Sequence, residues 1–356
     1  LSPWDRNQST YGYGEAYNDY FVNQLTELLT NYGEVFTVWF DGACGEGSNG
    51  KKQIYDWERY YQVIRTLQPG ACINVCGPDI RWCGNEAGDT RPSEWSVVPK
   101  RTSETERIAE LSQQTDDTVF RERKISASDS DLGSRMILEN ETELIWYPAE
   151  VNTSIRPGWF YHEEEDNHVR SLEELIHIYY NSVGGNAMFL LNIPPTKEGL
   201  FHANDVQRLE EIGAYLRSAF HNNLLENADL SVNSENHFDP EKSLTHHTVE
   251  NIRIDDYDTY FKPDDGVNNV IIDVCWKEKQ CIEHIVMKEN IQLSQRIEQF
   301  SILAEMNGEY QPIYKGTVVG YKKIIKLNSL FTDKIRIHIL DARVTPTLSF
   351  LGIYGK

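Results

Sequence analysis

Hydrophobic positions along the first 220 residues follow two periods that alternate with one another. Apolar side chains recur at helical spacing over three stretches, residues 17–32, 54–67 and 206–216. Uncharged runs that are typical of buried strands occupy residues 35–40, 71–75 and 187–191. Ser171 and Glu174 have the spacing of a capping box, which predicts that another helix begins there. Repeated strand–helix units indicate a parallel α/β sheet, either open or closed into a barrel.

The pattern changes near residue 227, where short segments with alternating apolar residues replace these units. The alternation is clearest at six positions, Phe300, Ile302, Ala304, Ile335, Ile337 and Ile339. Strands with one solvent-facing side are typical of an antiparallel sandwich, and the polar residues 231–240 are interpreted as a linker. The sequence therefore predicts two domains, an α/β domain at residues 1–228 and a β-sandwich at residues 229–356.

The composition is that of an ordinary globular protein, with 40% apolar and 25% charged residues among 356. The formal net charge of −21 argues against nucleic acid and anionic membranes as partners, because both require a basic face. No run of 18 apolar residues predicts a membrane-spanning helix. The six cysteines form no C-x-x-C pair, so we expect no zinc site. We interpret them mostly as small buried residues, and the sequence leaves undecided whether two of them form a disulfide bond.

Asp41 is the first candidate for chemistry. It follows the uncharged run at residues 35–40, which we interpret as a strand buried on both faces. Catalytic groups of barrel enzymes lie at the carboxyl ends of such strands, and Gly42 and Ala43 leave the carboxylate uncrowded. The alternative is that Asp41 only caps the next turn.

Glu86 is a second candidate carboxylate, in a glycine-rich loop after the predicted strand at residues 71–75. Carboxyl ends of parallel strands share one edge of the sheet, so Glu86 and Asp41 are expected on the same edge. Trp82 would raise the pKa of Glu86 by desolvation. A retaining glycosidase needs one ionised and one protonated carboxyl group, about 5–5.5 Å apart.

Seven motifs in chain order resemble those of the α-L-fucosidases of glycoside hydrolase family 29. They are SPWDRN (2–7), WFDGA (39–43), RWCGNEAG (81–88), RPSEW (91–95), RPGWFYH (156–162), YNSVGGN (180–186) and LNIPP (191–195). They are most similar to the branch that removes α-1,3- and α-1,4-linked fucose. The C-terminal part resembles a galactose-binding-like module.

The resemblance implies a (β/α)8 barrel followed by that module, and an exo-acting fucosidase that retains configuration. Asp41 would be the nucleophile and Glu86 the acid/base, with no metal and no organic cofactor. Substrate-binding candidates are four residues: Trp39, Trp159, Trp4 and Arg81.

Alternatives remain for these assignments. Core packing competes with sugar binding at both Trp39 and Trp159. Glu150 is a competing acid, although we favour a structural carboxylate paired with Arg156. Surface ion pairs are the favoured interpretation of Arg81 and Arg91.

The family's first barrel strands, and its paired histidines, precede the SPWDRN motif and are absent here. A complete barrel takes ~250 residues, and the only His-His pair is His246–His247. We therefore expect either a fragment of the enzyme or one half of a split enzyme, in which a second chain is the partner that supplies the missing strands. Substrates would be fucosylated oligosaccharides or glycoconjugates, and the location secreted or periplasmic. The rival hypotheses are another retaining glycosidase and a non-catalytic carbohydrate-binding remnant.

Overall fold

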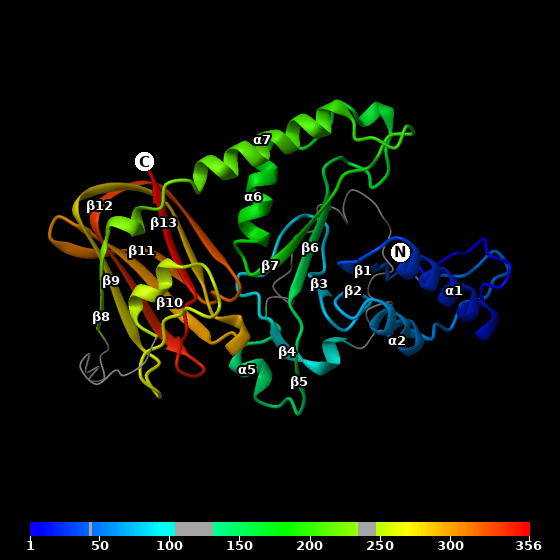
Figure 1. Cartoon of the computed structure of the whole chain (residues 1–356), viewed down its shortest axis with the longest axis horizontal. Helices are drawn as coiled ribbons and strands as arrows, with labels where there is room; N and C mark the ends of the chain where they lie inside the picture. Colours follow the sequence, from blue (N-terminus) through cyan, green and yellow to red (C-terminus); the bar gives the residue numbers. More distant parts are fainter. Residues whose placement is uncertain (43–44, 104–130, 234–246) are drawn as a thin grey trace. The chain divides into compact units, whose positions relative to one another are not determined.

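The computed structural model describes residues 1–42, 45–103, 131–233 and 247–356 (Figure 1). The chain divides into two compact units. The first unit comprises Leu1–Ala87, Val97–Arg123 and Arg135–Glu150, and the second comprises Gly88–Ser96, Lys124–Ser134 and Val151–Lys356. Each unit has its own elements and its own apolar core.

The first unit combines helices with short strands. Its elements are α1 (Glu15–Asn31), β1 (Thr37–Phe40), α2 (Trp57–Leu67), β2 (Cys72–Val75), β3 (Arg81–Trp82), β4 (Val97–Pro99), η1 (Lys100–Ser103), α5 (Arg135–Leu138) and β5 (Leu144–Trp146). β6 (Ala149–Ser154) begins in this unit and continues into the second. β1 and β2 are parallel, as are β3 and β6, whereas β4 and β5 are antiparallel. The parallel strand–helix units predicted for this region are confirmed.

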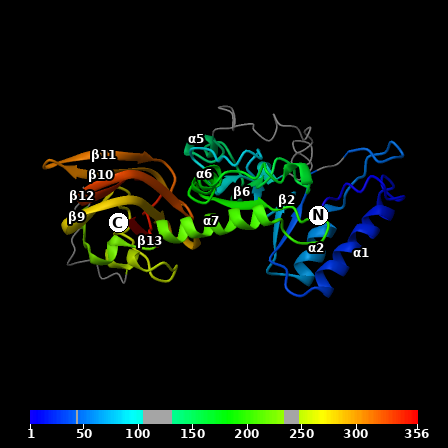
Figure 2. The ribbon, with the colours of Figure 1, turned by 90° about the horizontal axis from the view of Figure 1, so that it is seen from above.

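The core of the first unit lies between the β1–β2 pair and the two helices α1 and α2, which lie side by side (Figure 2). Phe40 is fully buried there, with its ring 6.2 Å from the ring of Phe21. Burial alternates along β1, since Val38 and Phe40 are buried while Thr37 and Trp39 are half-buried. The prediction that this strand is buried on both faces is therefore wrong, because α1 and α2 cover only one face.

Helix boundaries follow local capping. α1 ends two residues before Gly33, as predicted, and Gly33 has a positive φ of 83°. α2 begins at Trp57 because the Asp56 side chain accepts a hydrogen bond from the backbone N–H of Arg59 at 3.1 Å. Ile54 therefore lies outside this helix and is 81% exposed, so the predicted helix starts too early.

The second unit contains two long helices and an antiparallel sheet. Its elements are η3 (Glu163–Glu165), α6 (Leu172–Ser182), β7 (Ala187–Asn192), α7 (Ala203–Ala219), η4 (Leu224–Asn227), β8 (Asp229–Asn233), η5 (Val249–Arg253), β9 (Val270–Lys288), η6 (Ile291–Leu293), β10 (Ile297–Met306), β11 (Glu309–Gly316), β12 (Lys323–Ala342) and β13 (Phe350–Gly355). Ser171 caps α6 and forms both hydrogen bonds of the predicted capping box with Glu174.

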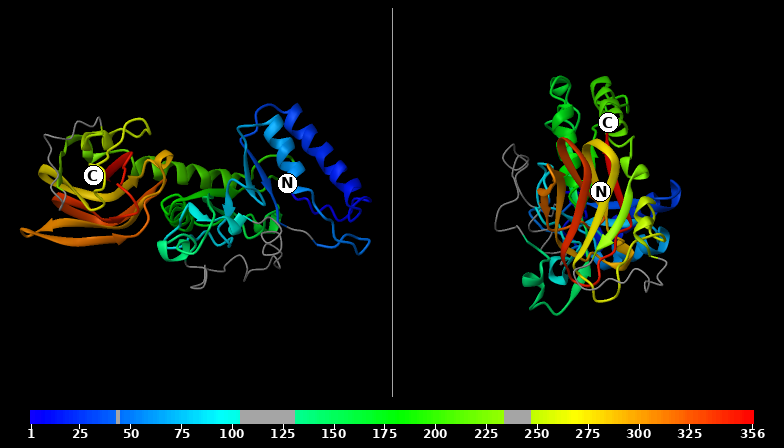
Figure 3. Two further views of the ribbon diagram at one scale, coloured as in Figure 1. Left: turned by 90° about the horizontal axis from the view of Figure 1, so that it is seen from below. Right: turned by 90° about the vertical axis from the view of Figure 1, so that its left-hand side faces the viewer.

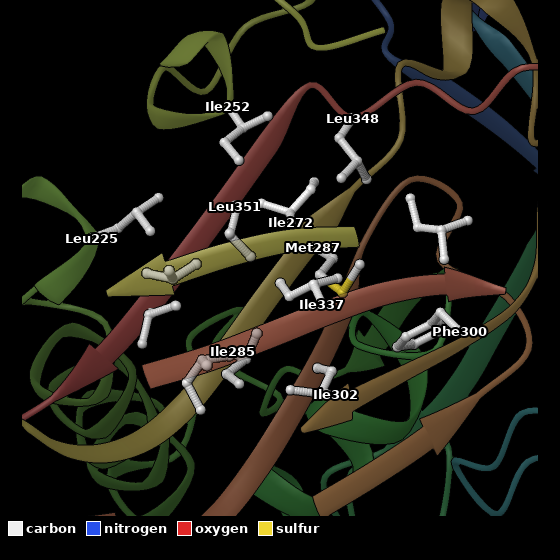
Figure 4. Packing of buried hydrophobic residues seen from close by; sticks show 14 of the residues in the cluster. Leu225, Ile252, Ile272, Ile285, Met287, Phe300, Ile302, Ile337, Leu348 and Leu351 are labelled. Carbon is white, nitrogen blue, oxygen red and sulfur yellow. The ribbon is translucent and has the colours of Figure 1, made fainter. Parts of the chain in front are cut away.

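Six strands form the antiparallel sheet, in the order β11-β10-β12-β9-β13, with β8 paired to β9 (Figure 3). The alternating positions noted in the sequence face one another: Phe300 pairs with Ile339 and Ile302 with Ile337. Their side chains fill one apolar cluster, shown in Figure 4. An antiparallel sheet after residue 228 is thereby confirmed. The predicted linker is wrong at its start, because Ser231 lies in β8.

A buried carboxylate joins three segments of this sheet. Glu289 is 0% exposed, and one of its oxygens accepts backbone N–H groups of Arg296 at 2.6 Å and Ile297 at 2.9 Å. The other accepts the N–H of Gly320 at 2.6 Å. Burial raises the pKa of Glu289 to about 7, and the three backbone donors offset part of that shift.

We expect this group to make the protein less stable as pH rises from about 4.5 to about 7. In that window the unfolded state loses the Glu289 proton while the folded state keeps it, so stability falls by up to ~3 kcal/mol. Urea unfolding at pH 5 and pH 7.5 measures this difference.

Glu289→Gln should remove that pH dependence. It should also lower the free energy of unfolding by ~1–3 kcal/mol at pH 5, because the side-chain amide N–H2 then faces a backbone donor. Glu278→Gln, at an exposed position of β9, is the control. A pH slope that is equal in wild type and Glu289→Gln contradicts the prediction.

Candidate active site

Asp41 directly follows β1, at its carboxyl end, as the sequence predicted. Its side chain is half-buried, and its backbone N–H donates to the carbonyl oxygen of Leu1 at 3.2 Å. Since side chains alternate along a strand and Phe40 faces the helices, Trp39 and Asp41 share the opposite face.

Trp39 is fixed by a carboxylate on that face. Its indole Nε1–H donates to Glu150 Oε1 at 2.6 Å, and the Asn74 side-chain amide donates to Glu150 Oε2 at 2.7 Å. Glu150 and Asn74 are both 0% exposed. Burial raises the pKa of Glu150, while the hydrogen bonds from Trp39 and Asn74 lower it.

The predicted pairing of Glu150 with Arg156 is wrong. The Arg156 guanidinium lies in the second unit, where Nε contacts both oxygens of Asp205 at 3.0 Å and Nη1 contacts Asp166 at 2.8 Å. It also lies over the Tyr161 ring, 4.9 Å from the centroid. The buried arginine therefore pairs with two carboxylates, Asp166 at 10 positions along the chain and Asp205 at 49.

Glu86 lies in the segment after β3, in the first unit. Its side chain is half-buried. The turn that carries it is held by Asn85, whose buried side-chain oxygen accepts the backbone N–H of Ala87 at 3.0 Å. Asn74 forms a parallel bridge to Ile80, immediately before β3. β1 and β2 form one sheet and β3 belongs to another, and this parallel bridge connects the two. Glu86 follows the carboxyl end of β3, as Asp41 follows that of β1.

The carboxyl end of β2 is strained. Val75 has a φ of +65°, a left-handed conformation that β-branched residues rarely adopt. Such strain costs about 1–3 kcal/mol and clusters at active sites. This distortion directly follows Asn74, one of the two donors to Glu150.

The prediction that Arg81 and Arg91 form ion pairs on the surface is wrong, because both side chains are buried. Arg81 is 4% exposed and donates from Nε to the Tyr147 carbonyl oxygen at 3.0 Å. Arg91 is 8% exposed and its guanidinium lies 3.4 Å from the buried Glu94 carboxylate, in the second unit. A substrate-binding role of Arg81 stays a prediction.

Trp4 and Trp159 are both half-buried, in different units. The Trp4 indole donates to the Glu46 carbonyl oxygen at 3.2 Å, and its ring lies against Gly45. The Trp159 carbonyl accepts the Asn192 side-chain amide at 3.0 Å. These contacts fix the two segments, and sugar binding by either ring stays a prediction.

Five cysteines fall within the described residues, and no disulfide is assigned to any of them there: Cys72, Cys76, Cys83, Cys275 and Cys281. Cys44 and His246 lie outside the described residues, whereas His247 stacks on Tyr260 with ring centroids 4.0 Å apart. In the part of the chain that the structure describes, no helix is long and apolar enough to cross a bilayer.

Asn74 is the site residue that sequence reasoning missed. Its signal was a single amide in the otherwise apolar run at residues 71–75. A polar side chain in a buried strand needs a hydrogen-bond partner, and that partner is Glu150, 76 positions away.

Comparison with known proteins gives consistent results. The chain is 33% identical to alpha-L-fucosidase 1 of Arabidopsis thaliana over 363 residues, covering 99% of this chain and 65% of the relative. Among solved structures, it is 39% identical to a candidate alpha-L-fucosidase of Bacteroides ovatus, with a TM-score of 0.77, covering 99% of this chain and 54% of that chain. It is 25% identical to a Ruminococcus gnavus GH29 fucosidase in complex with fucose, with a TM-score of 0.79, covering 100% of this chain and 71% of that one.

The chain thus spans slightly less than two thirds of the length of the curated relatives that it matches. A family model described as alpha-L-fucosidase matches residues 2–220, which is more than half of the chain. The chain belongs to the alpha-L-fucosidase family.

Proposed function

We propose that the complete protein is a retaining exo-α-L-fucosidase that removes terminal α-1,3- or α-1,4-linked L-fucose from oligosaccharides or glycoconjugates. The observation that carries this proposal is the position of Asp41. It follows a parallel strand at its carboxyl end, on the face that presents Trp39, and the loop of Glu86 follows β3, which begins directly after a parallel bridge to β2. Family membership supplies the substrate class.

The proposed reaction is a double displacement. Asp41 attacks the anomeric carbon while the bond to the leaving oxygen breaks, and Glu86 gives that oxygen its proton. Glu86 then removes a proton from water, whose oxygen attacks the same carbon and displaces Asp41. Two inversions return L-fucose in the α configuration, and no step requires a metal or an organic cofactor.

The proposal includes a (β/α)8 barrel to which further strands contribute, from the same protein or from a second chain. β1 has one strand partner among the described residues, β2. Along its other edge, Leu1 donates from its terminal nitrogen to the Trp39 carbonyl at 2.7 Å and accepts from Asp41. Phe36, just before β1, is 77% exposed. A neighbouring strand would complete this pairing and cover the apolar side chain. The C-terminal sheet would be a galactose-binding-like sandwich, and a secreted or periplasmic location is expected from the family.

A panel of aryl glycosides tests the activity, with the complete protein and with this chain alone. Release of the aryl group from the α-L-fucoside, and not from galactosides, supports the proposal. Hydrolysis of galactosides would favour another retaining glycosidase, and fucose binding without turnover by the complete protein would favour a binding remnant. Nuclear magnetic resonance of the first sugar released identifies its anomer, and β-L-fucose would exclude retention. Fucosylated trisaccharides with α-1,2, α-1,3 and α-1,4 linkages test the linkage.

A further inference from the structure

Glu150 is a fully buried carboxylate that the proposed double displacement does not use. Two neutral groups donate hydrogen bonds to it, the Trp39 indole at 2.6 Å and the Asn74 amide at 2.7 Å. Burying a carboxylate without a cation is costly, and burial accordingly raises the pKa of Glu150. A leucine would fill similar space without the cost of burying a charge. The presence of a carboxylate therefore indicates a role that depends on its two acceptor oxygens.

Strand register explains how the three residues meet. Trp39 lies directly opposite Asn74 in the β1–β2 pair, and Trp82 of β3 lies opposite Glu150 of β6. β1 and β2 form one sheet, β3 and β6 belong to another, and the parallel Asn74–Ile80 bridge connects the two. The two hydrogen bonds of Glu150 therefore tie β6 to both strands of the sheet at whose carboxyl end Asp41 lies.

We propose that Glu150 is a positioning residue of the fucosidase site, which holds the Trp39 indole in place two residues before Asp41; this inference rests on the proposed function. Tryptophan has a single hydrogen-bond donor, so an acceptor at Nε1 determines which way the ring plane turns. Asn74 holds the second oxygen and keeps the carboxylate from rotating away. Trp39 then presents a fixed ring surface beside the reacting carbon.

Nuclear magnetic resonance tests the contact without any assay of activity. The indole N–H signal of Trp39 is identified by its loss in Trp39→Phe. Glu150→Leu should move that signal upfield and speed its exchange with solvent. Glu150→Gln should move it less, because Gln keeps an acceptor for the indole and can bond to Asn74 with the amide turned. Glu58→Gln, which removes an exposed charge on α2, is the control. An unchanged signal in folded Glu150→Leu overturns the contact, whether or not the protein is a fucosidase.

Kinetics of the complete protein test the role. Glu150→Leu should lower kcat/KM by about 10- to 100-fold, and Glu150→Gln by less than about tenfold with the pH profile unchanged. In the Trp39→Phe background, Glu150→Leu should lower kcat/KM much less than it does in the wild type, because the carboxylate acts through the indole. If Glu150→Leu fails to fold, Glu150→Gln in the wild-type and Trp39→Phe backgrounds completes the same comparison. Two results together would overturn the proposal and identify Glu150 as the acid. Glu150→Gln would lose the limb of the pH profile that the catalytic acid produces, and the losses in kcat/KM would add in the double variant with Trp39→Phe.

Discussion

Asp41→Ala is expected to lower kcat/KM of the complete protein for an aryl α-L-fucoside by about 10⁴-fold or more. The physical reason is that Asp41 is the proposed nucleophile, so without its carboxylate the covalent glycosyl-enzyme cannot form and both chemical steps fail together. Steady-state hydrolysis of the aryl fucoside measures the loss. Asp19→Ala is the matched control, because the Asp19 side chain is 60% exposed on α1 and pairs with Arg59.

Azide can identify the missing group. A small anion that enters the space left by the Asp41 carboxylate should restore release of the aryl group and give β-L-fucosyl azide, since only one displacement occurs. Hydrolysis at the wild-type rate by Asp41→Ala would show that Asp41 is not the nucleophile. An α-configured azide product would equally contradict the assignment, because it requires a covalent intermediate on another residue.

Glu86→Ala is expected to affect substrates according to their leaving groups. Oligosaccharides need protonation of the leaving oxygen, so their kcat/KM should fall by about 10²- to 10⁴-fold. Aryl fucosides with strongly acidic phenols need little protonation, and their kcat/KM should change by less than about tenfold. The measurement is a series of aryl fucosides of graded phenol pKa, together with one fucosylated trisaccharide.

Azide also distinguishes this variant from the first. With Glu86→Ala it should attack the glycosyl-enzyme and yield α-L-fucosyl azide, since Asp41 still forms the intermediate. Glu27→Ala, at an exposed position of α1, serves as the control. Equal losses for good and poor leaving groups would remove Glu86 as the acid and make Glu150 the first alternative.

Features fixed by near neighbours in the chain could be predicted from the sequence. The capping box of Ser171 and Glu174 spans one turn, and both of its hydrogen bonds form. The alternation at Phe300 and Ile302 correctly predicted which side chains of β10 enter the apolar cluster, although Ser301 between them is buried as well. The position of Asp41 followed in the same way from the end of β1.

Contacts between distant residues could not be predicted this way. Glu150 was assigned to Arg156, six positions away, because charge and proximity in sequence favoured that pair. In the structure Glu150 binds Trp39, 111 positions away, and Arg156 binds Asp205, 49 positions away. The burial of β1 was overestimated for a related reason: an uncharged run does not reveal whether one or both faces of the strand are covered.

Glu289 has a consequence for how the C-terminal sheet assembles. Its carboxylate needs the end of β9, the start of β10 and the connection between β11 and β12 at the same time. If one of these strands paired out of register, the two carboxylate oxygens of Glu289 would lie in an apolar interior with too few hydrogen-bond donors, at a cost of several kcal/mol. The residue therefore discriminates against misaligned intermediates during folding, and it completes its hydrogen bonds only once all three segments have reached their native alignment.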